Sequence, residues 1–215
     1  EYEKTFKLAQ DFYWHNPAKL PTPAEWVTIR RERVKDAVDF VWWFSKSPHP
    51  NANNRRVLKE YSESMLDLFK NGYEAKLRPS GHNISKKFNK VHGGAIRSNL
   101  LKCSNTSSNS NYLQRCRENG IKPHPARYPE EIPEFFIRFL TRGGSRVLDP
   151  FAGSNVTGAV AEELGRCWMS FEIRPDYLDG SKFRFEQVTG KARPRHFQDI
   201  SRSDVISCRT VLATL

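Results

Sequence analysis

The sequence predicts an α/β fold built on a mostly parallel sheet, with a basic segment inserted between parts of that sheet. A strand, a small-residue turn, a helix and a second strand follow one another in residues 146–172, which is the pattern of a β-α-β unit. A nearly continuous apolar run in residues 37–44 is typical of a strand covered on both faces. Positive charge is concentrated between these two segments, and 215 residues suffice for one domain with a small insert.

Residues 1–45 are predicted to form part of the sheet. An aromatic-rich strand is expected at residues 6–14, and Asn16 with the following prolines ends it. The apolar run of residues 37–44 supplies a second strand. The region holds seven Lys or Arg and seven Asp or Glu, so its net charge is zero, as in an ordinary packed segment.

Residues 46–122 carry nearly all of the net charge of +11. They hold fifteen basic and five acidic residues, a balance of +10, whereas residues 123–215 hold thirteen and twelve, a balance of +1. Such a basic segment favours a polyanion partner, because neutralising phosphates releases counterions. The alternative is a solvated basic insert with no partner. One helix is predicted over residues 55–71, ended by Gly72, and a short helix is predicted near residues 112–117, before Gly120; the region is otherwise expected to be mostly irregular.

Residues 123–187 show the most regular pattern. Apolar side chains at helical spacing predict an amphipathic helix over residues 130–141. After it the pattern predicts a strand at 146–149, a turn at 152–155, a helix at about 156–164 and a strand at 167–172. Residues 188–215 show no clear hydrophobic period, so they are treated as a tail of undefined structure.

The turn of this β-α-β unit has the chemistry of a nucleoside pocket. Gly153 lets a ligand approach the backbone closely, and the N–H groups at the helix start favour an anionic group. Glu172, at the end of the second strand, is placed to accept hydrogen bonds from two ribose hydroxyls. One alternative is a generic dinucleotide fold, although its G-x-G-x-x-G fingerprint is missing. The other is a tight turn with a purely structural role.

A resemblance to a known family favours the pocket. Residues 149–154 (Asp-Pro-Phe-Ala-Gly-Ser) resemble the D-P-F-x-G-S-G-T-T segment that binds S-adenosylmethionine in DNA amino-methyltransferases. Glu172 matches the acid expected after the second strand, and residues 124–129 (His-Pro-Ala-Arg-Tyr-Pro) resemble the flanking cofactor motif. The cofactor motif follows the DNA-reading segment, which is similar to the β arrangement of these enzymes.

Within this family the sequence is most similar to the PvuII-type cytosine-N4 methyltransferases. The similar segments are residues 11–14, 42–46, 78–82 and 134–138, and the resemblance spans about residues 5–187. It implies a Rossmann-like S-adenosylmethionine-dependent methyltransferase sheet with an inserted target-recognition region. Residues 1–45 and 123–187 then belong to the methyltransferase domain, and residues 46–122 form the insert.

The resemblance also implies roles for individual residues. It assigns cofactor binding to Asp149, Phe151, Ala152, Gly153, Ser154, Asn155, Glu172, Pro125 and Arg127. It places Ser80, His82 and Asn83 in the target-recognition region, with an exposed loop histidine as the alternative for His82. The basic residues Lys86, Lys87, Lys90 and Arg97 are expected to bind DNA as phosphate contacts, because phosphates take most protein–DNA hydrogen bonds. It assigns the pocket for the target base to Tyr13, Trp14 and Asn16.

Two departures from the family pattern matter. Asn155-Val156 stands where many relatives have Gly-Thr, so a side chain at position 155 either narrows the pocket or adds a hydrogen bond to the cofactor. The family's catalytic motif, S-P-P-F/Y or D-P-P-Y, is missing, since the sequence contains no Pro-Pro dipeptide. No catalytic residue is therefore assigned, and the chain is expected to be a fragment or one half of a split enzyme. It should supply about four of the family's seven strands, leaving the strand near Val147 with an unpaired edge.

The implied function is S-adenosylmethionine-dependent methylation of cytosine N4 in a short palindromic site, as part of a restriction-modification system. The alternatives are an adenine-N6 methyltransferase and a catalytically silent DNA-binding relative. Expected partners are double-stranded DNA and a chain that supplies the catalytic half. No apolar run approaches the roughly 18 residues of a membrane span. The four cysteines lack zinc-site spacing, so no metal is expected, and isolated thiols suit a prokaryotic cytoplasm.

Overall fold

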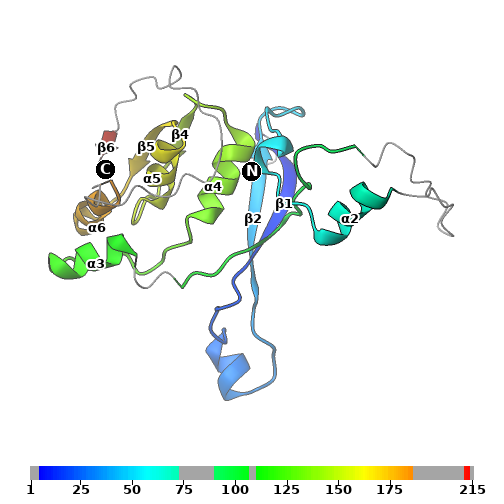
Figure 1. Ribbon diagram of the computed structural model, residues 1–215. Helices are drawn as coiled ribbons and strands as arrows, with labels where there is room; N and C mark the ends of the chain where they lie inside the picture. Colours follow the sequence, from blue (N-terminus) through cyan, green and yellow to red (C-terminus); the bar gives the residue numbers. More distant parts are fainter. Residues whose placement is uncertain (1–4, 73–89, 107–109, 186–210, 214–215) are drawn as a thin grey trace. The chain divides into compact units, whose positions relative to one another are not determined.

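The computed structural model describes residues 5–72, 90–106 and 110–185, together with the backbone of residues 211–213 (Figure 1). The chain divides into two compact units, and each is described by itself. The first unit comprises residues 1–52 and 99–215, and the second comprises residues 53–98. The second unit is shorter than the basic insert expected at 46–122, because the segment from residue 99 onward packs within the first unit.

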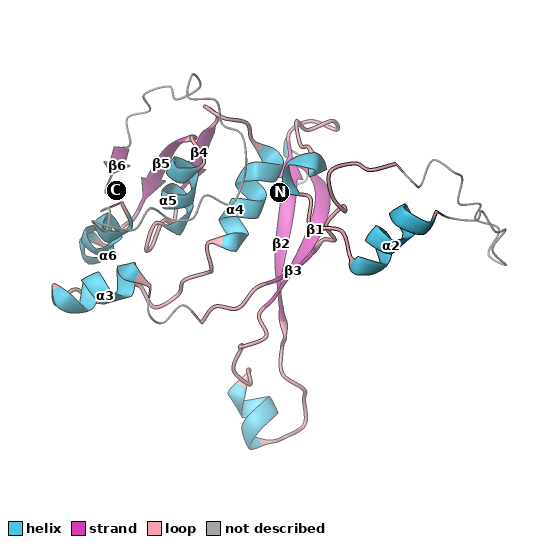
Figure 2. Ribbon diagram, viewed as in Figure 1, coloured by secondary structure: helices cyan, strands magenta, loops and turns pink. Residues whose placement is uncertain are grey.

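The first unit contains two three-stranded sheets, in the orders β2-β1-β3 and β4-β5-β6 (Figure 2). Its strands are β1 (Lys7–His15), β2 (Val38–Ser45), β3 (Leu100–Lys102), β4 (Arg146–Asp149), β5 (Cys167–Phe171) and β6 (Val211–Ala213). Its helices are η1 (Glu25–Ile29), α3 (Asn111–Glu118), α4 (Glu131–Leu140), α5 (Val156–Glu163), α6 (Pro175–Ser181) and η4 (Lys182–Arg184).

Helix α4 covers one face of the β1–β2 hairpin. The two strands are antiparallel, with Tyr13 opposite Phe40, and β3 pairs with β1 in parallel. Phe12 is buried, and its ring makes edge contacts with Phe135 and Phe136 on α4, at centroid distances of 5.7 and 5.1 Å. The predicted helix over residues 130–141 is confirmed, and its apolar side packs against the aromatic side chains of the hairpin.

The other face of the hairpin is open among the described residues. Phe40 is 66% and Trp42 63% exposed, whereas Trp43, which points the opposite way, packs on Phe139 of α4. Within the described part of the chain, the expectation that the strand at residues 37–44 is covered on both faces is therefore wrong. Successive side chains of a strand point to opposite faces, so a continuous apolar run does not tell whether one face or both are covered.

The second sheet holds the predicted β-α-β unit. Strands β4 and β5 are parallel, and α5 packs on them through a core that includes Val160, Trp168 and Ile137 of α4. The strands expected at 146–149 and 167–172 and the helix between them are confirmed. In the described part of the chain β4 pairs only with β5, which fits the expected unpaired edge. The described residues form six strands rather than about four, because β3 and β6, of three residues each, were not predicted.

The described residues of the second unit form two short helical segments and an isolated bridge. The helix predicted over residues 55–71 is wrong in its first half: η2 (Asn54–Val57) ends at an extended Leu58, and α2 (Glu63–Asn71) begins later. Lys59 instead pairs with Ala95. Gly72, with φ of 76°, ends α2 as predicted.

Two further expectations concern the membrane and the cysteines. Among the described residues no helix is long and apolar enough to cross a membrane. Cys103 and Cys116 are free thiols, whereas Cys208 lies outside the described residues.

Candidate functional site

The turn between β4 and α5 folds back over the carboxyl ends of two parallel strands. Two of its residues adopt left-handed backbone, Gly153 with φ of 53° and Asn155 with φ of 56°. The N–H of Ala152 donates to the carbonyl of Phe171 on β5 at 2.9 Å, and the N–H of Asn155 donates to the carbonyl of Ala152 at 2.7 Å. In open α/β sheets this edge is where ligands bind.

Glu172, the residue directly after β5, anchors the turn. Its Oε2 accepts a hydrogen bond from the N–H of Gly153 at 2.8 Å, and its Oε1 accepts one from the N–H of Arg174 at 2.9 Å. The side chain is buried, so its orientation is fixed by these two donors. A carboxylate can accept about four hydrogen bonds, so acceptor capacity remains on both oxygens. The predicted residues Glu172 and Gly153 are thus brought together, at the place the motif implies.

His124 packs directly against the turn. A Cβ added to Gly153 would lie 3.2 Å from the His124 imidazole, so the space beside this glycine is filled by a histidine ring. The ring makes an edge contact with Tyr177, at a centroid distance of 4.5 Å. This space was expected to admit a ligand, and His124 was not among the predicted cofactor residues. Its signal was available, because His124 begins the flanking motif of residues 124–129.

Asn155 is fully buried and is the N-terminal capping residue of α5. Its Oδ1 accepts hydrogen bonds from the N–H of Gly158 at 3.1 Å and from the Ser170 hydroxyl at 2.8 Å. Because the Gly158 N–H can only donate, the atom that faces it must be the amide oxygen. The Asn155 Nδ2 has no hydrogen-bond partner among the described residues. One of the N–H groups at the helix start is therefore satisfied by the protein itself.

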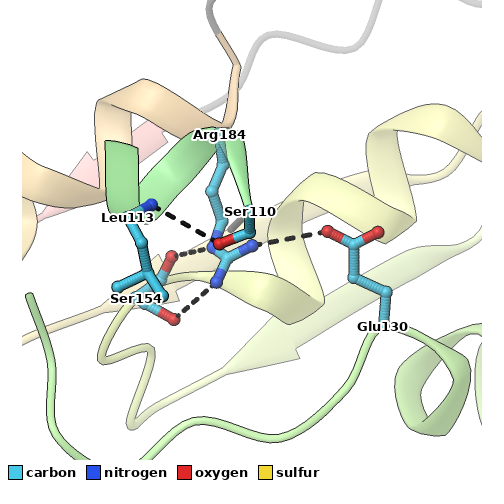
Figure 3. Close-up of polar contacts among 5 residues, drawn as sticks. All are labelled: Ser110, Leu113, Glu130, Ser154 and Arg184. Atoms are coloured by element: carbon cyan, nitrogen blue, oxygen red, sulfur yellow. Dashed lines mark hydrogen bonds and ion pairs between the residues drawn. The ribbon is translucent and has the colours of Figure 1, made fainter. Parts of the chain in front are cut away.

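The remaining predicted cofactor residues surround this turn. Asp149 Oδ1 accepts from the N–H of Phe151 at 3.0 Å, and the Phe151 side chain is exposed. Arg127 donates to the carbonyl of His124, and Pro125 is exposed. Ser154 is buried, and both its carbonyl and its hydroxyl accept hydrogen bonds from Arg184 (Figure 3). Arg184 was not predicted, since it lies outside every motif recognised in the sequence.

Tyr128 ties the flanking motif to the first turn of α5. Its hydroxyl hydrogen-bonds with the hydroxyl of Thr157. Burial raises the pKa of Tyr128, and the hydrogen bond with Thr157 opposes that shift. The phenol is therefore neutral over the physiological range.

The predicted base-pocket residues lie at the carboxyl end of β1. The Tyr13 ring contacts Phe40, and Trp14 Nε1 donates to the carbonyl of Cys103 at 3.0 Å. Asn16 Oδ1 accepts from the N–H of Asn105 at 3.4 Å, and the Asn105 side chain donates to the carbonyl of Arg127. Asn105 therefore links the predicted base pocket to the flanking cofactor motif.

The predicted DNA contacts fall in the second unit. Lys90 and Arg97 are exposed there. The other predicted contacts lie outside the described residues: Ser80, His82, Asn83, Lys86 and Lys87. In the described part of the chain no group of three or more His, Cys, Asp or Glu side chains is placed to hold a metal ion.

Comparison with known proteins gives a family and two relatives. The profile of a family described as DNA methylase, comprising N6 and N4 methyltransferases, matches residues 1–183. The chain is 53% identical over 186 residues to the type II methyltransferase M.PvuII of Proteus hauseri, covering 85% of this chain and 55% of that protein. It is 34% identical over 119 residues to the type II methyltransferase M.ScaI of Streptomyces caespitosus, covering 54% of this chain and 33% of that protein.

A solved structure agrees with these matches. The PvuII DNA methyltransferase, described as cytosine-N4-specific, superimposes with a TM-score of 0.66 at 44% identity, over 86% of this chain and 53% of that one. The chain thus spans about half the length of the relative that it matches.

Proposed function

This chain belongs to the DNA methylase family, and we propose that it forms the cofactor-binding and DNA-reading part of an S-adenosylmethionine-dependent, cytosine-N4-specific DNA methyltransferase of a restriction-modification system. One observation carries the proposal. The Glu172 carboxylate holds the Gly153 turn at the carboxyl ends of two parallel strands, in a chain 53% identical to M.PvuII. A restriction-modification role implies a prokaryotic cytoplasm.

The residues at the turn fit a nucleoside-bearing cofactor. Glu172 offers an oriented carboxylate for ribose hydroxyls. Phe151, within the turn, and Ile173, next to Glu172, expose large apolar side chains that suit an adenine ring. S-adenosylmethionine, when bound here, supplies the methyl group. The chain's own contribution is to hold that group in place for in-line attack.

Double-stranded DNA is the partner that the charge distribution supports. Residues 46–122 have a net charge of +10, and phosphate contacts supply most of the affinity in such interfaces. Lys90 and Arg97 are exposed and available for phosphates. We assign phosphate contact to Lys86 and Lys87 as well, and recognition of bases to residues 80–83.

The target base must leave the duplex before it can react. We assign the receiving pocket to Tyr13, Trp14 and Asn16, at the end of β1. The link from Asn16 through Asn105 to Arg127 supports this assignment, because it couples the pocket wall to the cofactor motif. A pocket at that position would bring the base to the cofactor turn.

We further propose that the catalytic motif comes from polypeptide outside these 215 residues, in the same protein or in a partner chain. The 215 residues contain no Pro-Pro dipeptide. By resemblance, the missing Ser or Asp and a backbone carbonyl hold the amino hydrogens of the base. The open face of β2 and the edge of β4 are the surfaces on which such a segment would pack.

Adenine N6 is the second candidate for the methylated atom. Both chemistries share this scaffold, and the first letter of the missing motif separates them. The similarity to a structure described as cytosine-N4-specific favours cytosine. A catalytically silent DNA-binding relative is the third candidate.

A complementation experiment tests the proposal. The chain is expressed together with the part of M.PvuII that it does not match, supplied as a separate polypeptide, and incubated with duplex DNA and S-adenosylmethionine. We expect N4-methylcytosine in the DNA, detected by mass spectrometry of nucleosides, and none from either polypeptide alone. The matched control is the same pair carrying Glu172→Ala.

Each outcome discriminates between the candidates. N6-methyladenine would establish the adenine alternative. Cofactor binding without any methylated base would establish the silent relative. Methylated base from the 215-residue chain alone would refute the assignment of the catalytic motif to another segment.

A further inference from the structure

Arg184 occupies a position that the methyltransferase motifs do not reach. It lies at the end of η4, beyond the acid of β5, yet its side chain is only 7% exposed. Its Nε donates to the carbonyl of Ser154 at 2.6 Å, and a terminal nitrogen donates to the Ser154 hydroxyl at 3.1 Å. Both acceptors belong to the turn that precedes α5 (Figure 3).

The same guanidinium contacts two other elements. It forms an ion pair with Glu130 at the start of α4, at 3.4 Å, and it lies 4.5 Å from the ring centroid of Tyr112 on α3. The Tyr112 hydroxyl accepts a hydrogen bond from the N–H of His124, the residue whose ring packs on Gly153. Arg184 therefore contacts the turn directly, and Tyr112 connects it to His124, whose ring packs on the turn.

We propose that Arg184 is a positioning residue for the cofactor: it fixes the 151–155 turn in its binding shape by holding the Ser154 peptide. The proposal rests on the proposed function. Glu172, directly after β5, fixes the N–H of Gly153, and Arg184 fixes the carbonyl of the following residue, Ser154. Two oppositely charged side chains thus set the orientation of the peptide groups on either side of the Gly153–Ser154 bond.

The backbone of the turn explains why two anchors are needed. Gly153 and Asn155 both have positive φ, and Asn155 is one of only two described non-glycine residues that do. Gly153 adopts this backbone freely, but at Asn155, which has a Cβ, left-handed backbone persists only where surrounding contacts determine it. With the Ser154 carbonyl released, the turn can relax toward ordinary backbone, which moves the N–H of Gly153 away from Glu172.

Arg166 provides a matched control. It is buried, and its guanidinium also donates to the hydroxyl and the carbonyl of one residue, Thr141, at 3.0 and 3.2 Å. It lies immediately before β5, at the amino end of that strand, whereas the cofactor turn lies at the carboxyl ends. Arg166→Lys and Arg184→Lys therefore both disrupt guanidinium hydrogen bonds to a carbonyl and a hydroxyl, at opposite edges of one sheet. Arg166→Lys disrupts in addition the hydrogen bond to the Leu164 carbonyl.

The test measures the dissociation constant of S-adenosylmethionine for the 215-residue chain by calorimetry. Circular dichroism measures the folded fraction of each variant, so that affinities are compared for folded protein. Losing two charged hydrogen bonds in Arg184→Gln should weaken binding by about tenfold to thirtyfold. Arg184→Lys keeps one donor and should weaken it by about threefold to tenfold. Arg166→Lys, measured where it is folded, should bind as the wild type does.

Two results would overturn the inference. Wild-type affinity in folded Arg184→Gln would show that the turn keeps its shape without this contact. Equal weakening in Arg166→Lys and Arg184→Lys would show a general loss of structure. If the wild-type chain itself does not bind S-adenosylmethionine, the proposed function fails, and the positioning role fails with it.

Discussion

The cofactor turn and the β1–β2 hairpin differ in how much of their environment this chain supplies. At the turn, Ser154, Asn155 and Glu172 are all buried, and each accepts hydrogen bonds from neighbouring parts of the same unit. On the hairpin, α4 covers one face, while Phe40 and Trp42 are mostly exposed on the other.

The difference shows which part of the molecule is self-contained. A turn whose buried acceptors are satisfied from within the same unit is held in its geometry by the chain itself. An aromatic face exposed to water carries an unfavourable free energy that another segment would remove on packing. Binding of the cofactor therefore depends mainly on residues present here, whereas catalysis depends on what covers the hairpin.

The strongest test compares the two faces of the hairpin. Phe12→Ala removes a buried ring from the contacts with α4 and should lower the free energy of unfolding by about 3–5 kcal/mol. Phe40→Ala, on the open face, should lower it by less than about 1 kcal/mol. Urea unfolding of the 215-residue chain measures both. Equal losses would show that the chain itself covers the second face.

The second test removes the acid of the turn. Glu172→Ala deletes the acceptor for Gly153 and for the ribose, and we expect S-adenosylmethionine to bind roughly thirtyfold to hundredfold more weakly, about 2–3 kcal/mol. Glu134→Ala, which removes only a partly exposed ion pair with Arg138, is the control. Unchanged cofactor affinity in Glu172→Ala would contradict the assignment of this turn.

The β-α-β unit was predictable from the sequence, because its signals are local. The apolar spacing of α4 and α5, the glycine turn and the acid at the end of β5 all lie within about forty residues, and the structure brings Gly153 and Glu172 together as expected. The short strands were not predictable, since β3 contains only three residues and forms by pairing with distant Tyr13.

Two site residues were missed for different reasons. His124 belongs to a recognised motif, but only the structure shows that its ring fills the space beside Gly153. Arg184 reaches Ser154 across thirty residues of sequence, and no periodicity or spacing encodes such a contact. Local sequence patterns therefore do not reveal contacts that a long side chain makes with a distant element.

The third test breaks the internal packing of the turn. A Cβ at Gly158 would lie 2.3 Å from Asn155 Oδ1 and 2.9 Å from the Trp168 ring. Gly158→Ala should therefore cost about 1–3 kcal/mol of stability despite the better helix propensity of Ala. Gly143→Ala, where the added Cβ meets nothing within 4 Å, is the control. Thermal melting of the two variants separates them, and equal midpoints would contradict this packing.

The smallest expected effect is the pH dependence that Tyr128 contributes. Burial raises the pKa of Tyr128 above its ordinary value of 10.0. The folded state therefore favours the neutral phenol, and this stability is fully present below pH 10.0 and is lost as the pH rises through the raised pKa. Replacing the phenol removes this loss, at the expense of the hydrogen bond with Thr157.

We expect the free energy of unfolding of the wild type to fall more steeply above pH 10.0 than that of Tyr128→Phe, by less than about 1 kcal/mol in total. Urea unfolding at a series of alkaline pH values measures the slope. Tyr61→Phe, in the second unit, controls for the loss of a tyrosine elsewhere. Parallel slopes for the wild type and Tyr128→Phe would mean that Tyr128 ionises as readily in the folded chain as in the unfolded one, and that the contact with α5 leaves it open to water.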